Sequence, residues 1–296
     1  MSRGLRLILH KFSIEKVTSF QGIYRFVFLG LITLLPVLAN AQICRHWSEA
    51  IRAGELTVRL EEASGVAASR QFPRLYFIND SGDSGFFYVT GMNGANPRAI
   101  RVAGFNPRDT EALSLGPCPG RRGASCLYVA DIGDNDRRRR SIEIVVVAEV
   151  KDFPQSVAPR NRLSFRYPDG PHDAEGMAVH PDGTIYILTK ERPAKLFKTS
   201  RDARQTTLIE VKTLDADTPT DLAISDDGTR MVVLTYADAY EYSLDFKQQQ
   251  KVGITFLQQQ ESVTYLPGSR SFIYTTERLL PMLPQFIMRM DCLDPK

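Results

Sequence analysis

The sequence lacks the residues and spacings on which several common protein classes depend. Its 296 residues include one tryptophan, four histidines and four cysteines. There is no CxxC pair, and His46, His172 and His180 show no ligand spacing, so a zinc site is the weaker interpretation of the cysteines. HExxH, GxSxG and P-loop motifs are also absent, which removes the usual sequence indications of a zinc protease, an α/β-hydrolase or a nucleotide-binding enzyme.

The chain also lacks any long stretch with the periodicity of an amphipathic helix. It consists instead of short β-rich runs separated by Gly, Pro, Asn and Asp. This pattern predicts an all-β protein.

The apolar run 26–39 is short for a membrane span and contains Pro36. A basic leader precedes it, and Ala39-Asn40-Ala41 follows as a small-x-small cleavage site. We therefore predict a signal peptide over 1–41 and a mature domain over 42–296 in the periplasm or outside the cell, with no stable membrane span after cleavage. A retained membrane anchor is the alternative.

Excess positive charge is missing once the leader is removed. The leader carries five of the 37 basic and one of the 34 acidic side chains, which leaves 32 and 33 and a net charge of −1. A nearly neutral mature chain gives no support for a nucleic-acid partner.

The four cysteines all lie after the predicted cleavage site, where an even number favours disulfides. Cys118 and Cys126 flank a loop-like stretch, so we expect these two cysteines to pair with each other. Cys44 would then pair with Cys292 and join the two ends of the mature chain.

A repeated unit is present, in which a small acidic or polar pair precedes two apolar strands joined by a turn. Its five copies are "EASGVAASRQFPRLYFINDSGD", "DTEALSLGPCPGRRGASCLYVADIGD", "DAEGMAVHPDGTIYILTKE", "PTDLAISDDGTRMVVLTYAD" and "ESVTYLPGSRSFIYTTER". Two more strands follow in most copies, for example "IEIVVVAEV" with "NRLSFRY" and "AYEYSLD" with "VGITFL". Four strands in each repeat of about 40 to 50 residues predict a single β-propeller.

We predict five four-stranded blades, with six as the alternative because the second repeat is long. The fifth copy supplies three strands, the last being "QFIMRM" at 285–290. The strand "GELTVRL" at 54–60 can complete that blade and remove the exposed edges. A Cys44–Cys292 bond would then clamp the closed ring.

Acidic residues recur at the start of four inner strands, with Ser64 at the same register position in the first repeat, and polar residues recur where the second strand ends. Both positions lie at the same end of a hairpin, so we expect these side chains to meet at one mouth of the central channel. Carboxylates that converge there repel one another unless a cation is bound, and oxygen ligands suit calcium. The predicted calcium ligands are Asp80, Asp83, Glu111, Asp131, Asp134, Asn135, Glu175, Asp221 and Glu261. Turn residues that cap strand ends are the alternative interpretation.

Further side chains at the same strand ends could bind an anionic ligand. These candidates are Arg137, Arg138, Lys190, Glu191, Tyr236, Glu277 and Arg278. Arginine pairs bidentately with phosphate or carboxylate groups. The four arginines of "ADIGDNDRRRR" at 130–140 are also explained by a solvated hairpin, in which charge discourages edge pairing.

The motifs "EASGVAAS", "INDSGD", "DTEALSL", "LYVADIGDNDRRR", "DAEGMAV" and "YILTKE" resemble exported bacterial propellers of the phytase-like (esterase-like phytase) and SdiA-regulated type. The resemblance covers most of 62–280 and is most specific in the first three repeats. It implies a secreted propeller with metal-binding potential at the channel mouth.

Two functions of different class remain open at this point. The first is a monomeric binding or scaffold module with a calcium site and an unidentified small anionic ligand or protein partner. The second is a calcium-dependent phosphoester or ester hydrolase, in which Lys190 and Arg137 or Arg138 would bind the anion. Propellers host both classes, so the fold alone does not decide between them.

Overall fold

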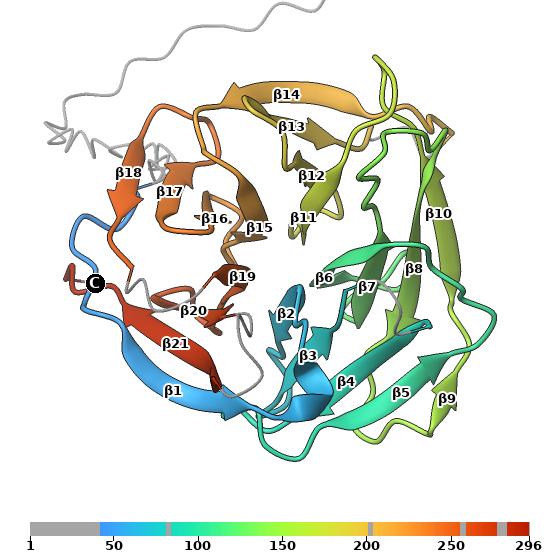
Figure 1. Ribbon diagram of the computed structural model, residues 1–296, viewed down its shortest axis with the longest axis horizontal. Helices are drawn as coiled ribbons and strands as arrows, with labels where there is room; N and C mark the ends of the chain where they lie inside the picture. The colour runs from blue at the N-terminus through green and yellow to red at the C-terminus, as the bar shows by residue number, and fades with distance from the viewer. Residues whose placement is uncertain (1–41, 81–83, 201–203, 255–258, 277–282, 296) are drawn as a thin grey trace, which may run out of the picture. The chain divides into compact units, whose positions relative to one another are not determined.

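The computed structural model describes residues 42–80, 84–200, 204–254, 259–276 and 283–295, and this part of the chain is all-β. Its strands form five antiparallel sheets that stand as blades around a common centre (Figure 1). The predicted β-propeller with five blades is confirmed, and the alternative with six blades is wrong. The predicted signal peptide over 1–41 lies outside the described residues.

Each blade begins with an inner strand and ends with an outer one. Blade 1 holds β2 (Gly65–Ala68), β3 (Leu75–Ile78), β4 (Phe86–Thr90), β5 (Arg98–Val102) and the short parallel β9 (Ser156–Val157), and blade 2 holds β6 (Thr110–Pro117), β7 (Ser125–Asp131), β8 (Ile142–Ala148) and β10 (Asn161–Phe165). Blade 3 holds β11 (Ala174–Val179), β12 (Ile185–Thr189), β13 (Ala194–Lys198) and β14 (Ile209–Leu214), and blade 4 holds β15 (Pro219–Ile224), β16 (Arg230–Thr235), β17 (Ala239–Ser243) and β18 (Gln249–Val252). Blade 5 holds β19 (Gln260–Tyr265), β20 (Ser271–Thr276), β21 (Gln285–Asp291) and β1 (Ile51–Leu56), and a 3-10 turn, η1 (Val58–Leu60), follows β1.

The hydrophobic core is divided into five clusters, each of which lies between two neighbouring blades. Both faces of the middle strands are therefore buried, and their sequences are continuous apolar runs rather than alternating ones. In β8, for example, Ile144 and Val146 pack against blade 3, whereas Val145 and Val147 pack against blade 1. The outer strands β10 and β14 carry exposed polar side chains, as expected for edges that face water.

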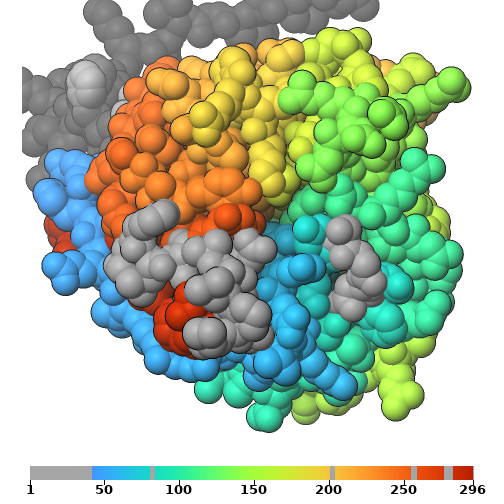
Figure 2. Space-filling view, viewed as in Figure 1, coloured from blue at the N-terminus to red at the C-terminus, as the bar shows by residue number. Residues whose placement is uncertain are grey.

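The N-terminal strand closes the ring by pairing with the last strand of the chain. β1 runs antiparallel to β21, and Figures 1 and 2 show the blue N-terminal segment beside the red C-terminal one. The predicted closure is confirmed, but the strand is Ile51–Leu56 rather than 54–60. Residues 58–60 instead form η1, which buries Leu60.

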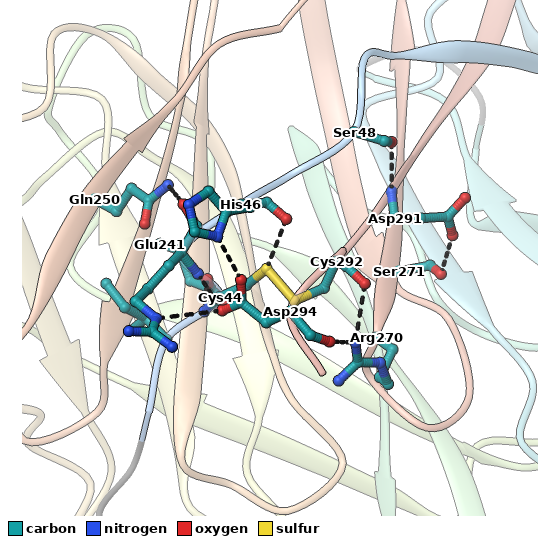
Figure 3. Close-up of a disulfide and its surroundings, with 12 residues drawn as sticks. Cys44, His46, Ser48, Glu241, Gln250, Arg270, Ser271, Asp291, Cys292 and Asp294 are labelled. Atoms are coloured by element: carbon teal, nitrogen blue, oxygen red, sulfur yellow. Dashed lines mark hydrogen bonds and ion pairs between the residues drawn. A yellow bond between two sulfur atoms is a disulfide. The ribbon is translucent and has the colours of Figure 1, made fainter. Parts of the chain in front are cut away.

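Both predicted disulfides are present, Cys44–Cys292 and Cys118–Cys126. The first lies at the seam of the ring, where the Cys44 backbone NH donates to Glu241 of blade 4 at 2.8 Å (Figure 3). On the other side of the seam, the Asp291 backbone NH donates to Ser48 Oγ at 2.9 Å. The segment before β1 is thus bonded to blade 4 and to the C-terminal strand.

Glycine allows the tight hairpins that join the first two strands of blades 3, 4 and 5. Gly183, Gly228 and Gly268 all have positive φ angles of 71° to 90°, a region that glycine adopts without steric cost. The predicted turns at 180–183 and 226–228 are confirmed.

The fourth strand of blade 4 begins earlier than expected. The sequence suggested "VGITFL", but the outer strand is β18, Gln249–Val252. A tight turn after β17, in which the Gln248 and Ser243 backbones bond each other, brings Gln249 opposite Tyr242 directly. Residues 255–257 of the suggested strand lie outside the described residues.

Candidate functional site

Irregularities in the inner strands position acidic side chains at one mouth of the channel. The pairing register of β6 shifts at Glu111, that of β11 at Glu175, and that of β19 around Glu261. A β-bulge inserts an extra residue into one strand and re-aims the side chain there. All three glutamates line the same cavity, so the bulge recurs where a side chain must point into the channel.

The cavity at this mouth has a volume of about 160 Å³. It is lined by Glu62, Ser64, Asp80, Glu111, Asn135, Glu175, Lys190, Tyr236, Gln259 and Glu261. The channel beyond it is nearly filled by the five inner strands, which leave a space of about 30 Å³. At its other end Arg70 forms an ion pair with Asp226 of blade 4.

Three carboxylates approach one another most closely in this region. Oxygen atoms of Asp80, Asp109 and Glu111 all lie within 4.8 Å of one another. Gly133 makes room for them, since a Cβ there would lie 2.5 Å from Asp109 Oδ2 and 2.8 Å from Glu111 Oε1. A side chain in place of the glycine of "DIGD" would therefore displace these two carboxylates.

Burial and mutual repulsion raise the pKa values of these acids. Glu111 is 4% exposed, and burial followed by the charges of Glu175, Asp80 and Asp109 holds its pKa well above the usual range. Burial and the charges of Asp80 and Asp173 raise the pKa of Asp109 to about 6. The cavity therefore disfavours the fully ionised state of its own side chains, which is the condition that a bound cation relieves.

Lys190 compensates part of this negative charge. Its Nζ lies 2.8 Å from Glu175 Oε1 and 5.5 Å from the centre of the Tyr236 ring. Burial raises the pKa of Glu175 to about 7 even though Lys190 opposes the shift. The lysine thus offsets part of the charge of Glu175 on one side of the cavity.

The raised pKa values predict how stability depends on pH when no divalent cation is present. An acid whose folded-state pKa is raised stabilises the fold below its unfolded pKa, and this contribution is lost as the pH rises through the folded value. For Asp109 this pH window runs from the ordinary pKa of 3.8 to the folded-state pKa of about 6. We expect the free energy of unfolding in EDTA to fall, relative to that of Asp109→Asn, as the pH rises from about 4 to about 7. Urea denaturation at both ends of the window measures this, and a difference that does not change with pH would contradict the electrostatic account.

Other predicted calcium ligands lie elsewhere and have structural partners. Asp131 forms a bidentate ion pair with Arg139 at 2.7 and 2.8 Å, and Asp131 Oδ1 also accepts the Asp109 backbone NH at 2.9 Å. Asp134 accepts the Arg139 backbone NH at 2.7 Å and so stabilises the loop. Among the polar residues of "DIGDN", only Asn135 lines the cavity.

Asp221 also does not line the cavity, although the sequence repeat aligns it with Glu111 and Glu175. In β15 the register shifts between Pro219 and Asp221, so Thr220 occupies the bulge that Glu111 and Glu175 occupy in their strands. Asp221 lies one residue further and is fully buried. It accepts the Val263 backbone NH at 2.9 Å and thereby joins blade 4 to blade 5.

The predicted anion-binding residues are divided among several places. Lys190 and Tyr236 line the cavity, whereas Glu191 bonds His172 at 2.8 Å and lies 3.4 Å from Arg137 Nε. Arg138 is exposed on blade 2. Asp83, Glu277 and Arg278 lie outside the described residues.

Sequence reasoning missed several residues at this mouth, of which Asp109 is the most important. Asp109 precedes β6, two residues before Glu111, and its carboxylate belongs to the close cluster. Two acids spaced by two residues at the start of an inner strand would have indicated it. Glu62 and Gln259 line the cavity as well.

The fold and this cavity define a five-bladed β-propeller with an acidic pocket at one mouth of its channel. Within the described residues, no helix has the length and apolar character needed to cross a membrane. No family model matches the chain, and no curated protein sequence matches it.

Solved structures with a similar chain path share little sequence with this protein. A luciferin-regenerating enzyme is 13% identical with a TM-score of 0.48, over 82% of this chain and 95% of that chain. A nidogen/laminin complex is 15% identical with a TM-score of 0.49, over 75% and 74% of the two chains. Hydrazine synthase of Kuenenia stuttgartiensis is 14% identical with a TM-score of 0.41, over 79% and 61%.

Proposed function

We propose that this protein is an exported β-propeller binding module that holds calcium in the acidic cavity at the mouth of its channel. The observation that carries the proposal is the convergence of Asp80, Asp109 and Glu111. Calcium–oxygen distances of about 2.3–2.6 Å allow two ligands of one ion to lie about 4.6–5.2 Å apart. Oxygens within 4.8 Å of one another therefore fit a single ion.

The donor set also suits calcium chemically. Carboxylate, carboxamide and hydroxyl oxygens surround the cavity, with Ser64 and Asn135 as neutral donors beside the acids. Hard oxygen donors without thiolate or imidazole favour calcium or magnesium over transition metals. Bound calcium would neutralise the acids and fix blades 1 and 2 to each other at this mouth. The two disulfides are compatible with an oxidising compartment, which supports action after export.

Calcium is expected to raise the melting temperature of the chelator-treated protein. A ligand at about 100 times its Kd stabilises the native state by about 2.7 kcal/mol, which for a chain of this size corresponds to about 5–10 °C. Glu111→Gln should abolish the shift because it removes the buried charge of the cluster. Glu210→Gln on the outer strand β14 changes the net charge equally and should retain the shift. Equal shifts in all three proteins, or none in the wild type, would overturn the proposal.

A second candidate function is calcium-dependent hydrolysis of a phosphoester or related ester. The observation in its favour is that Lys190 and Tyr236 line the same cavity as the acids, so an anion and a cation could be held side by side. A phosphoester screen on the calcium-loaded protein separates the two functions. Turnover that is lost in Lys190→Met supports the hydrolase, and a calcium-dependent shift without turnover supports the binding module.

A further inference from the structure

A second concave region lies in blade 2 and shares no lining residue with the acidic cavity. It has a volume of about 550 Å³ and is bordered by the loop before β6, by the loop between β7 and β8, and by the end of β10. Its cationic side chains are Arg108, Arg138, Arg139 and Arg140. Three of the four arginines of "ADIGDNDRRRR", in the loop that follows β7, thus line this pocket.

The arginines of this pocket have different roles. Arg139 is 10% exposed and is committed to Asp131, and its Nη1 also donates to the Gly133 carbonyl at 2.8 Å. Arg137 has a positive φ of 52° and extends to Glu191 of blade 3 instead. Arg139 therefore fixes the loop, and its neighbours in the sequence, Arg138 and Arg140, are exposed.

Three guanidinium groups at this pocket carry a positive charge that no closely paired carboxylate offsets. Among the described residues, neither Arg108 nor Arg140 forms an ion pair, and Arg138 has only Asp136 at 3.5 Å with both side chains exposed. The one other acid that lines the pocket besides Asp131 is Glu143, whose carboxylate is paired with Arg162 at 2.7 Å. The region is a concentrated positive charge on a chain whose net charge is only +3.

We propose that this pocket binds a small ligand that carries phosphate. A carboxylate is satisfied by one guanidinium fork, whereas a phosphate has three terminal oxygens and up to two charges and can accept from several forks at once. Asn106, Ser141 and Ser164 add neutral polar groups at the rim. The volume exceeds that of a single phosphate, so the pocket has room for the group to which the phosphate is attached. This proposal does not depend on the calcium site.

Pyrophosphate in EDTA-containing buffer of low ionic strength is the probe that tests this pocket, because no metal can then bridge it to the acidic cavity. Titration calorimetry should show binding to the wild type that weakens as salt is added. The double variant Arg108→Gln/Arg140→Gln should lose affinity by about tenfold to a hundredfold, since two charge-assisted contacts are removed.

Arg121→Gln/Arg122→Gln is the matched control, because it also removes two exposed charges, from the Cys118–Cys126 loop at the opposite end of the same blade. It should bind pyrophosphate as the wild type does. The melting temperature without ligand shows whether each variant is folded, and we expect no change because both sites are exposed. The proposal is overturned if the wild type does not bind, if Arg108→Gln/Arg140→Gln binds within about twofold of the wild type, or if Arg121→Gln/Arg122→Gln loses as much affinity.

Discussion

Replacement of Cys44 and Cys292 by alanine is expected to lower the free energy of unfolding by about 4–5 kcal/mol. The bond joins residues 248 positions apart, so its loss releases nearly the whole unfolded chain from a covalent constraint. It also removes the clamp beside the pairing of β1 with β21. For a chain of this size the change corresponds to a fall in melting temperature of about 10 °C or more.

Guanidinium denaturation under non-reducing conditions measures this effect, and the second disulfide provides a matched control. Cys118–Cys126 joins residues only eight positions apart, so Cys118→Ala/Cys126→Ala should cost about 2–3 kcal/mol. Hydrogen exchange should rise at β1 and β21 in the first variant and not in the second. An equal loss of stability in the two variants, or unchanged protection of β1, would show that the seam does not depend on the terminal disulfide.

Arg139→Ala is expected to destabilise the protein by about 3–5 kcal/mol, because it leaves the buried Asp131 carboxylate without its cation. The two side chains are 10% and 5% exposed and are joined by two charge-assisted hydrogen bonds. Arg138→Ala, one residue earlier in the sequence, removes a side chain that is 80% exposed and should change stability by no more than about 0.5 kcal/mol.

Arg139→Ala should also reduce the calcium-dependent rise in melting temperature. Asp131 accepts the backbone NH groups of Arg108 and Asp109, so the ion pair orients the segment that carries the Asp109 carboxylate. Chemical denaturation and the calcium-dependent shift, measured on both variants, test the two effects together. A similar stability for Arg138→Ala and Arg139→Ala would contradict the structural role of the pair.

The blade count and the closure of the ring could be predicted because they depend on features that repeat along the chain. Inner strands that start with acids and hairpins that contain glycine recur in blades 2 to 5, and the terminal cysteines flank the seam. Strand ends were less predictable, since residues 58–60 form a 3-10 turn that packs Leu60 and a tight turn starts β18 early. Such choices depend on local hydrogen bonds that periodicity does not record.

The candidate site was only partly predictable, because the direction of a side chain depends on bulges. Glu111 and Glu175 occupy bulges and reach the cavity, whereas Asp221 occupies the next position and bonds a neighbouring blade. A shift of one residue in a strand exchanges the two faces, and the repeat alone does not show where the shift falls. Asp131 has the residue type of a ligand, but its partner Arg139 was visible only once the loop was folded.

Equilibrium dialysis of calcium against the chelator-treated protein tests the central claim of a cation at the channel mouth most directly. The account predicts one calcium ion per chain for the wild type at about pH 7.5, where calcium competes well against protons for the acids. It predicts loss of this ion in Asp109→Asn, which removes a charge from the close cluster, and its retention in Glu210→Gln. A wild type that binds no calcium, or an Asp109→Asn variant that binds it as tightly as the wild type, would contradict the account.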